Sequence, residues 1–317
     1  MKKISEVKAT AIQAAPIFTA DLVSRWIRFA GVAAKSEATY RMAVKQMLKY
    51  FAVKEISSPT REDLIAWRDS LIEAGRSAAT VQLYLTSAKL FYRWLAQEGL
   101  YENIGDHLKS RVKISHEHKK DALSAKQSAA LLKAVKGESE KALRDRAILA
   151  LMLSTGLRTI EIERADVGDF SYFHGDCYLR VQGKGHSQKD QLVRVDGRVK
   201  ALIDEYLKKR GNTKPNQPLF VSTARMNKGA RISTQTVRKM VKGNLRSIGL
   251  DSPRLTAHSL RHSAALQMLL GGASLEQVQQ SLRHVSIATT MIYNHSVTRM
   301  QNKAETYAAD ALFGAAG

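Results

Sequence analysis

Apolar residues recur at helical spacing through the first third of the chain, and this pattern constrains the fold more than any other feature. Such stripes run through residues 17–104, for example at Trp26 and Ile27, and they indicate helices with one buried face. Thr60 and Ser77 stand where helix N-caps are expected. The pattern divides into four short helices and predicts a small helical bundle over this range.

The periodicity changes further along the chain. Residues 105–120 carry five Lys and Arg with little apolar periodicity, which predicts a basic interdomain linker. A second domain is expected over 121–317, where helical patterns are interrupted by two stretches that alternate like strands, 177–181 and 191–195. The expected fold class is therefore mainly α with a small β-sheet in the second domain.

The balance of charge points to a polyanionic partner. The chain has 50 Lys+Arg against 29 Asp+Glu, a formal net charge of +21, and the charge is spread along it rather than confined to a tail. Nucleic acid is the partner this favours, although a basic ribosome-associated protein would share the property. The single Cys177 excludes an intrachain disulfide framework and a Cys-rich zinc site. With no long apolar run and no signal-peptide pattern at the start, a cytoplasmic protein is expected.

Arg158 lies just after a glycine turn, at the expected start of a helix. Arginine stays charged and matches phosphate oxygens bidentately, and a helix start also favours anions. Glu161 follows one helical turn later and is expected to orient the Arg158 guanidinium from behind. Taken alone, an Arg–Glu pair at this spacing more often marks an ordinary surface ion pair.

His258 and Arg261 are three residues apart, so both side chains are expected on one helical face. A histidine at such a position is as often a satisfied core residue as a catalytic one. The next residue, His262, is expected to point elsewhere and to be structural.

Tyr293 is the candidate nucleophile. It is expected on a helix capped by Ser286, with His284 in the preceding loop. A free tyrosine has a pKa near 10, so attack at neutral pH needs arginines that favour the phenolate, or a histidine that accepts the proton. Without those neighbours, Tyr293 would be an ordinary packing residue of the core.

Taken together, these segments resemble the tyrosine recombinase (phage integrase) family. The resemblance covers the whole chain, with 17–104 as the helical core-binding (SAM-like) DNA-binding domain and 121–317 as the catalytic domain with a C-terminal tail helix. The nine-residue step from His284 to Tyr293 is similar to the closing motif of the family. The matching catalytic set, in chain order, is Arg158, Lys184, His258, Arg261, His284 and Tyr293.

The resemblance implies a mechanism. Tyr293 would attack in line to give a 3′-phosphotyrosyl link and release a 5′-hydroxyl, while Arg158 and Arg261 clamp the scissile phosphate. His258 would be the acid/base partner of Tyr293, His284 would hydrogen-bond the phosphate, and Lys184 would protonate the leaving oxygen. No metal and no cofactor are implied, because the guanidinium pair supplies the cationic charge.

Two departures from the family pattern concern this site. The turn that carries Lys184 is longer than usual, which makes Lys189 a rival for the acid role. Arg283 stands before His284, where the family usually has glycine. It either perturbs the loop or adds a phosphate contact, and both readings stay open at this point.

The implied partners are double-stranded DNA core sites and further copies of the chain, with a dimer on each site and a tetramer in the synapse. Accessory DNA-bending or directionality factors are also implied. The apolar side of 297–313 is expected to dock on a neighbouring subunit or to pack on its own domain. The basic residues proposed to contact DNA are Lys45, Arg76, Lys89, Lys113, Arg231, Lys239 and Lys242.

Several roles are compatible with this resemblance. The charge and the unusual motif residues favour an integrase of a phage or conjugative transposon, and the compact two-domain plan favours an Xer-type recombinase that resolves chromosome or plasmid dimers. A type IB topoisomerase uses a similar set of residues, although the compact bundle and the His284 motif argue against it. A DNA-binding protein that has lost catalysis is the remaining class, and the full set of groups argues against that.

Overall fold

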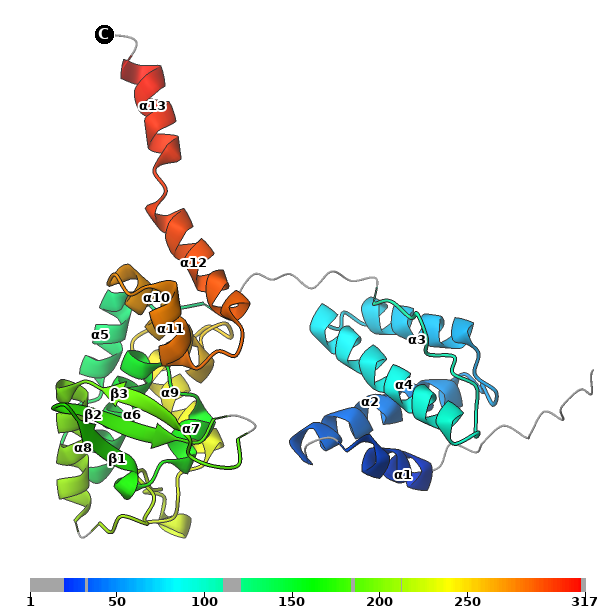
Figure 1. Cartoon of the computed structure of the whole chain (residues 1–317), viewed down its shortest axis with the longest axis horizontal. Coiled ribbons are helices and arrows are strands. Elements are labelled where there is room, and N and C mark those ends of the chain that lie inside the picture. Colours follow the sequence, from blue (N-terminus) through cyan, green and yellow to red (C-terminus); the bar gives the residue numbers. More distant parts are fainter. Residues whose placement is uncertain (1–19, 32–33, 111–120, 184–185, 212, 315–317) are drawn as a thin grey trace, which may run out of the picture. The chain divides into compact units, whose positions relative to one another are not determined.

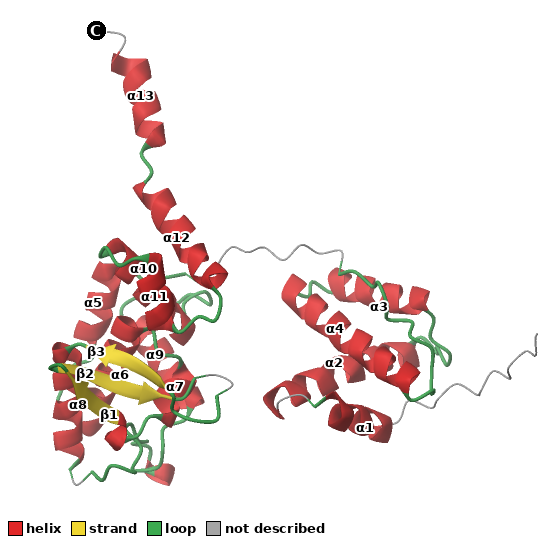
Figure 2. Ribbon diagram, in the orientation of Figure 1, coloured by secondary structure: helices red, strands yellow, loops and turns green. Residues whose placement is uncertain are grey.

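The computed structural model describes residues 20–31, 34–110, 121–183, 186–211 and 213–314. The chain divides into two compact units, residues 1–115 and 116–317. Both are dominated by helices, and the only sheet of the described residues lies in the second unit (Figures 1 and 2). The predicted fold class, mainly α with one small sheet, is confirmed.

The first unit is a bundle of four helices. Its caps are those expected from the sequence, because Thr60 and Ser77 each accept a backbone N–H three residues on. Large aromatic side chains such as Trp26, Trp67 and Phe91 are almost fully buried between the helices. The helices are α1 (Ala20–Ala30), α2 (Ala34–Val53), α3 (Arg61–Glu73) and α4 (Ala78–Gln97).

The residues that follow α4 still pack on this bundle. Leu108 is buried in its core, and Arg68 donates a hydrogen bond of 3.0 Å to the carbonyl of Lys109. Residues 105–110, expected at the start of the linker, therefore belong to the first unit. The rest of the expected linker lies outside the described residues.

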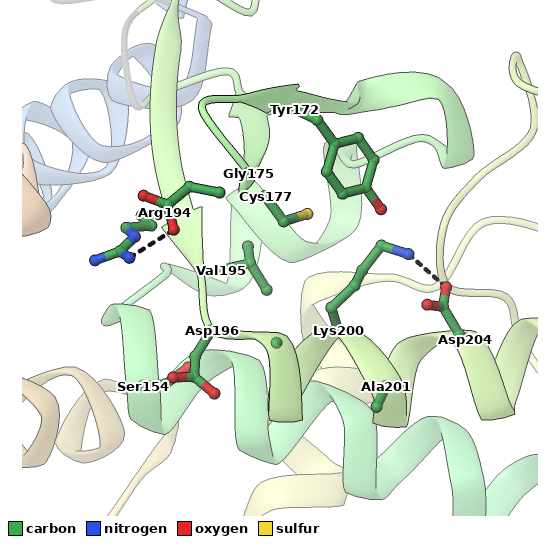
Figure 3. Close-up of a pocket in the computed structure, with 12 residues that line it drawn as sticks. Ser154, Tyr172, Gly175, Cys177, Arg194, Val195, Asp196, Lys200, Ala201 and Asp204 are labelled. Atoms are coloured by element: carbon green, nitrogen blue, oxygen red, sulfur yellow. Dashed lines mark hydrogen bonds and ion pairs between the residues drawn. The ribbon is translucent and has the colours of Figure 1, made fainter.

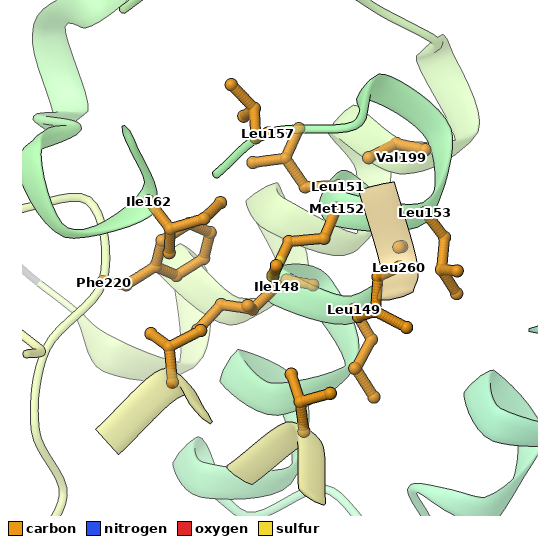
Figure 4. Close-up of a cluster of buried hydrophobic side chains, with 14 of the residues drawn as sticks. Ile148, Leu149, Leu151, Met152, Leu153, Leu157, Ile162, Val199, Phe220 and Leu260 are labelled. Carbon is orange, nitrogen blue, oxygen red and sulfur yellow. The ribbon is translucent and has the colours of Figure 1, made fainter. Parts of the chain in front are cut away.

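The second unit is built around a long central helix. This helix, α6 (Glu140–Thr155), is buried along most of its length, and Ile148, Leu149 and Met152 form its core with side chains from α8 and α10 (Figure 4). An antiparallel three-stranded sheet of order β1-β2-β3 packs beside it. The strand β1 was not expected from the sequence. The elements of this half are α5 (Ala125–Ala134), α7 (Thr159–Arg164), η1 (Val167–Asp169), β1 (Phe170–Phe173), β2 (Asp176–Val181), β3 (Gln191–Val195) and α8 (Gly197–Arg210).

Helices of the last third complete this unit and carry most of the candidate residues. α10 packs against α6, and α11 and α12 pack against each other and against α10. No helix among the described residues is both long and apolar enough to span a membrane. The elements are η2 (Arg225–Asn227), α9 (Thr234–Ser247), α10 (Ala257–Leu270), α11 (Leu275–Leu282), α12 (Ile287–Gln301) and α13 (Ala304–Gly314).

Candidate active site

A glycine turn delivers Arg158 to the site. Gly156 ends α6 in the left-handed conformation, with φ of 66°, and Arg158 becomes the N-cap of α7. A Cβ at Gly156 would lie 2.4 Å from the side chain of Leu282, so glycine is required here both for its backbone and for its size. The turn thus fixes the position of the Arg158 backbone, from which its side chain extends into the site.

Arg261 is the buried centre of the site. Its side chain leaves α10 and donates hydrogen bonds to the carbonyl of Gly156, at 2.6 Å, and to the carbonyl of Leu282. Arg261 therefore ties the turn after α6 to the end of α11. Burial, reinforced by the nearby Arg158 charge, lowers the pKa of Arg261 to about 9, which leaves it protonated at neutral pH.

A buried carboxylate holds two further guanidinium groups. Glu161 accepts from Arg158 Nη1 at 2.9 Å and from the Arg158 backbone N–H at 2.8 Å. The same carboxylate accepts from Arg283 Nη2 at 2.8 Å, although the two residues are 122 positions apart. Arg283 itself has φ of 56° and ψ of 48°, the left-handed conformation that glycine adopts most easily. The loop therefore keeps the backbone conformation that a glycine would have, and the Arg283 side chain points to Glu161.

Tyr293 is held by a histidine that the sequence analysis discounted. The hydroxyl of Tyr293 lies 2.6 Å from Nδ1 of His262, and Tyr293 is only 3% exposed. The expectation that His262 points elsewhere is wrong. His258 and His262 are four residues apart on α10 and share a face, with their ring centroids 4.6 Å apart. That spacing was visible in the sequence and is the signal that was missed.

The electrostatics keep Tyr293 protonated in this state. Burial raises its pKa, and the charges of Arg261 and Arg158 offset only part of that rise. A phenol donates its proton to an imidazole nitrogen that carries none, so the Tyr293–His262 pair is arranged for proton transfer. Any attack by Tyr293 has to begin with the loss of this proton.

His284 stacks on Tyr293. Its ring lies nearly parallel to that of Tyr293, with centroids 6.3 Å apart and an angle of 11° between the planes. Its Nδ1 is 2.8 Å from Oγ1 of Thr290, one turn before Tyr293 on α12. Burial, followed by the charges of Arg261 and Arg158, lowers the pKa of His284 to about 4. The ring is therefore neutral at physiological pH, and when Thr290 donates to Nδ1, Nε2 is left as a hydrogen-bond donor.

The two lysines proposed for the acid role differ in what the structure describes. Lys184 lies outside the described residues. Lys189 is described, and its ammonium group is held between the carboxylates of Asp166, at 2.6 Å, and Asp169. The ion pairs of Asp166 with Lys189 and Arg231 lower the pKa of that carboxyl group. Lys189 is thus engaged in an ion-pair cluster that follows α7.

The residues proposed to contact DNA fall into three groups. Arg231 and Lys242 are engaged in intramolecular ion pairs with Asp166 and Asp251. Lys113 lies outside the described residues. The others are exposed or half-buried side chains on α2, α4 and α9 and in the turn before α4, namely Lys45, Lys89, Lys239 and Arg76.

A hollow of about 440 Å³ near the sheet and α8 does not coincide with this site (Figure 3). None of the residues expected for catalysis lines it. Its two cationic side chains are both paired with carboxylates of the lining, Arg194 with Asp176 at 2.6 Å and Lys200 with Asp204 at 2.5 Å. Such a lining offers little free positive charge to a phosphate.

The described site brings guanidinium groups, a carboxylate and a phenol together. Arg158 and Arg283 donate to the Glu161 carboxylate, whose charge also acts on Arg261. Tyr293 lies close enough for the charges of Arg158 and Arg261 to affect its pKa. The model of the phage integrase family matches residues 121–300, which include all of these groups. The chain belongs to the phage integrase family. The model of its N-terminal SAM-like domain matches residues 20–102.

Curated relatives support the same assignment over most of the chain. The tyrosine recombinase XerC of Corynebacterium efficiens is 32% identical over 270 residues, which cover 83% of each protein. The tyrosine recombinase XerD of Halalkalibacterium halodurans is 29% identical over 281 residues, which cover 86% of this chain and 91% of that protein. The predicted enzyme class is confirmed: this recombinase cleaves and rejoins DNA through a tyrosine.

Solved structures share the fold at lower identity. XerH site-specific recombinase bound to a palindromic difH substrate has a TM-score of 0.70 and 19% identity, and the match covers 90% of this chain and 83% of that one. The integrase of the Tn1549 transposon in complex with circular intermediate DNA has a TM-score of 0.67 and 19% identity, over 86% of this chain and 94% of that one. Both Xer recombinases and transposon integrases therefore share this architecture.

Proposed function

We propose that this recombinase cuts DNA by in-line attack of Tyr293 on a phosphate held by Arg158 and Arg261. The observation that carries the proposal is the Tyr293 hydroxyl, which lies 2.6 Å from a histidine nitrogen and close enough to Arg158 and Arg261 for both charges to act on its pKa. Attack forms a bond between the tyrosine oxygen and phosphorus and breaks the bond to the 5′ oxygen. The products are a 3′-phosphotyrosyl link and a free 5′-hydroxyl.

The protons can be assigned to particular groups in this proposal. His262 accepts the phenolic proton of Tyr293, and His258, in ring contact with His262, is placed to pass it on. His284 donates from Nε2 to a phosphate oxygen, since its ring is neutral. Lys184 protonates the leaving 5′ oxygen. Lys189 is the less suitable acid because two carboxylates already occupy its ammonium group.

Exchange of His262 for glutamine tests the proton transfer. The variant keeps the size of the side chain but has no basic nitrogen, and we expect single-turnover cleavage at pH 7 to fall by about 10²–10⁴-fold, the usual contribution of a general base. The loss should shrink as pH rises, because hydroxide then takes over the proton. Cleavage rates are measured on a nicked duplex between pH 6 and 9. His174→Gln, at the turn between β1 and β2, is the control, and a wild-type rate for His262→Gln would show that another group is the base.

The tail helix α13 is proposed to join neighbouring subunits. None of its described residues is buried, and Tyr307, Leu312 and Phe313 are 71%, 74% and 80% exposed. A hollow of about 370 Å³ along α10 and α11 offers a partly apolar surface for the α13 of a second copy, because Met268, Ala273 and Val278 line it together with polar side chains of α11. We propose dimers on each DNA core site and a tetramer in the synapse, joined in this way.

Removal of the chain from Lys303 onward tests this assembly. The truncated protein should bind a single half-site normally, yet lose cooperative binding to a full site and give no recombinant products. Gel-shift titrations on half and full sites measure the difference. Glu305→Gln, which changes a polar residue of the same helix, is the control. Unchanged cooperativity after truncation would show that the tail does not join subunits.

Two biological roles fit the proposal, each with its own support. Relatives named XerC and XerD, at 32% and 29% identity, favour resolution of chromosome or plasmid dimers. The net charge of +21 and Arg283 in the closing motif favour integration of a mobile element. Cleavage mapping separates them, with duplexes taken from the flanks of the protein's own gene and from the replication terminus of its host. Sites at the gene flanks indicate an integrase, and sites at the terminus indicate an Xer-type enzyme.

A further inference from the structure

Arg283 reaches the back of the active site without facing solvent. Its side chain is 6% exposed, that of Glu161 is fully buried, and that of Arg158 is 27% exposed. Arg158 is therefore the most exposed member of this series of three charged groups, and Glu161 and Arg283 are its buried members. Of the three, Arg158 is the one open to a ligand.

Arg283 changes the net charge of the site. Glu161 alone would offset the charge of either Arg158 or Arg261, so that two guanidinium groups and one carboxylate leave a net charge of +1. With Arg283 present, three positive charges minus one negative charge leave +2. A phosphodiester carries one negative charge, and further negative charge develops on its oxygens during in-line attack. When Arg283 offsets the charge of Glu161, the charges of both Arg158 and Arg261 remain to act on the phosphate.

We propose that Arg283 is a positioning residue that neutralises Glu161, so that Glu161 can orient Arg158 without weakening its pull on the scissile phosphate. Arg283 does this from behind the carboxylate and does not contact the DNA. This inference rests on the proposed function and deepens it, since it concerns how strongly the guanidinium pair of that site acts on phosphate.

The backbone of Arg283 supports the assignment. A residue with a Cβ is strained in the left-handed conformation, and glycine would avoid this strain. The Nε of Arg283 also has no hydrogen-bond partner among the described residues, although it is buried. The arginine adds two contacts, from Nη1 to the carbonyl of Ser281 at 2.7 Å and from Nη2 to Glu161, and of these two only the second joins it to the active site.

Arg283→Gly removes the side chain and leaves the backbone unchanged, because glycine readily adopts the left-handed conformation. The variant therefore reports the effect of the side chain alone. We expect single-turnover cleavage at saturating DNA to fall about tenfold to a hundredfold, because the uncompensated Glu161 carboxylate would then offset the Arg158 charge that acts on the phosphate. The affinity for DNA should change far less. Arg283→Lys, which keeps the charge, should recover part of the rate.

Two comparisons exclude a merely structural role. In a Glu161→Gln background the carboxylate is already neutral, so the further change Arg283→Gly should have little effect on the rate. On a duplex with a methylphosphonate at the scissile position the phosphate carries no charge, and the difference between wild type and Arg283→Gly should narrow. His174→Gly is the matched control, because His174 also has a positive φ, of 49°, in the same unit.

The outcomes distinguish this inference from the proposed function. If wild type forms no covalent adduct on any duplex that it binds, the proposed function fails. If wild type cleaves and Arg283→Gly cleaves equally well, the inference is overturned. An equal loss in the presence and absence of the Glu161 carboxylate would overturn it too, because Arg283 would then act by another route.

Discussion

Replacement of Tyr293 by phenylalanine is expected to abolish the covalent protein–DNA adduct while DNA binding survives. The phenol oxygen is the proposed nucleophile, and phenylalanine has no oxygen that could form the bond to phosphorus. Loss of a nucleophile of this kind reduces cleavage by more than about 10⁴-fold. The measurement is adduct formation on a nicked duplex that releases the cut strand and so traps the covalent intermediate.

The folded structure should tolerate this change. Phenylalanine keeps the ring that stacks on His284, at a centroid distance of 6.3 Å, and loses only the hydroxyl that pairs with His262. A net hydrogen bond is worth about 1 kcal/mol, so the free energy of unfolding should fall by about that amount. An inactive yet folded and DNA-binding variant therefore reports on chemistry alone.

Tyr206→Phe is the matched control for this experiment. Tyr206 is fully buried in the same unit, and its hydroxyl accepts a hydrogen bond of 3.2 Å from the Val221 backbone N–H. Its loss should cost similar stability and leave cleavage unchanged. An adduct formed by Tyr293→Phe would assign the nucleophile to another residue, and equal losses in both variants would point to unfolding instead.

Features set by neighbouring residues could be predicted from the sequence. The helix caps at Thr60, Ser77 and Ser286 depend on a side chain and a backbone N–H two or three residues on, and all three are present. The i, i+3 spacing that was expected to bring Glu161 to Arg158 is likewise a property of one helical turn. The fold class followed from the same local periodicity.

Features set by distant contacts could not be predicted in this way. Arg283 reaches Glu161 across 122 positions, and the sequence left its effect open between two readings. Strand β1 is four residues long and half exposed, so its pattern is too short to distinguish from a loop. His262 is a different case, because its spacing from His258 was visible, yet its partner Tyr293 lies on another helix and only the tertiary fold brings them together.

Replacement of Arg261 by lysine is expected to impair both catalysis and folding. Lysine keeps the charge but has no planar fork, so it cannot hold the carbonyls of Gly156 and Leu282 while also contacting phosphate bidentately. We expect cleavage to fall by about 10²–10³-fold, as when one donor to a developing oxyanion is lost. Loss of a buried hydrogen bond to a charged group should also lower the free energy of unfolding by about 1–3 kcal/mol.

The two effects can be separated with a second buried arginine. Arg144 is 2% exposed, as is Arg261, and it donates a hydrogen bond of 2.8 Å to the carbonyl of Val221, with no candidate catalytic residue among its partners. Arg144→Lys should therefore destabilise the fold to a similar degree, and the protein that remains folded should cleave at the wild-type rate. Urea unfolding and single-turnover cleavage at low temperature measure the two quantities. If both variants lost stability and activity in the same proportion, Arg261 would be holding the turn together, and the phosphate would have to be bound by Arg158 and other groups.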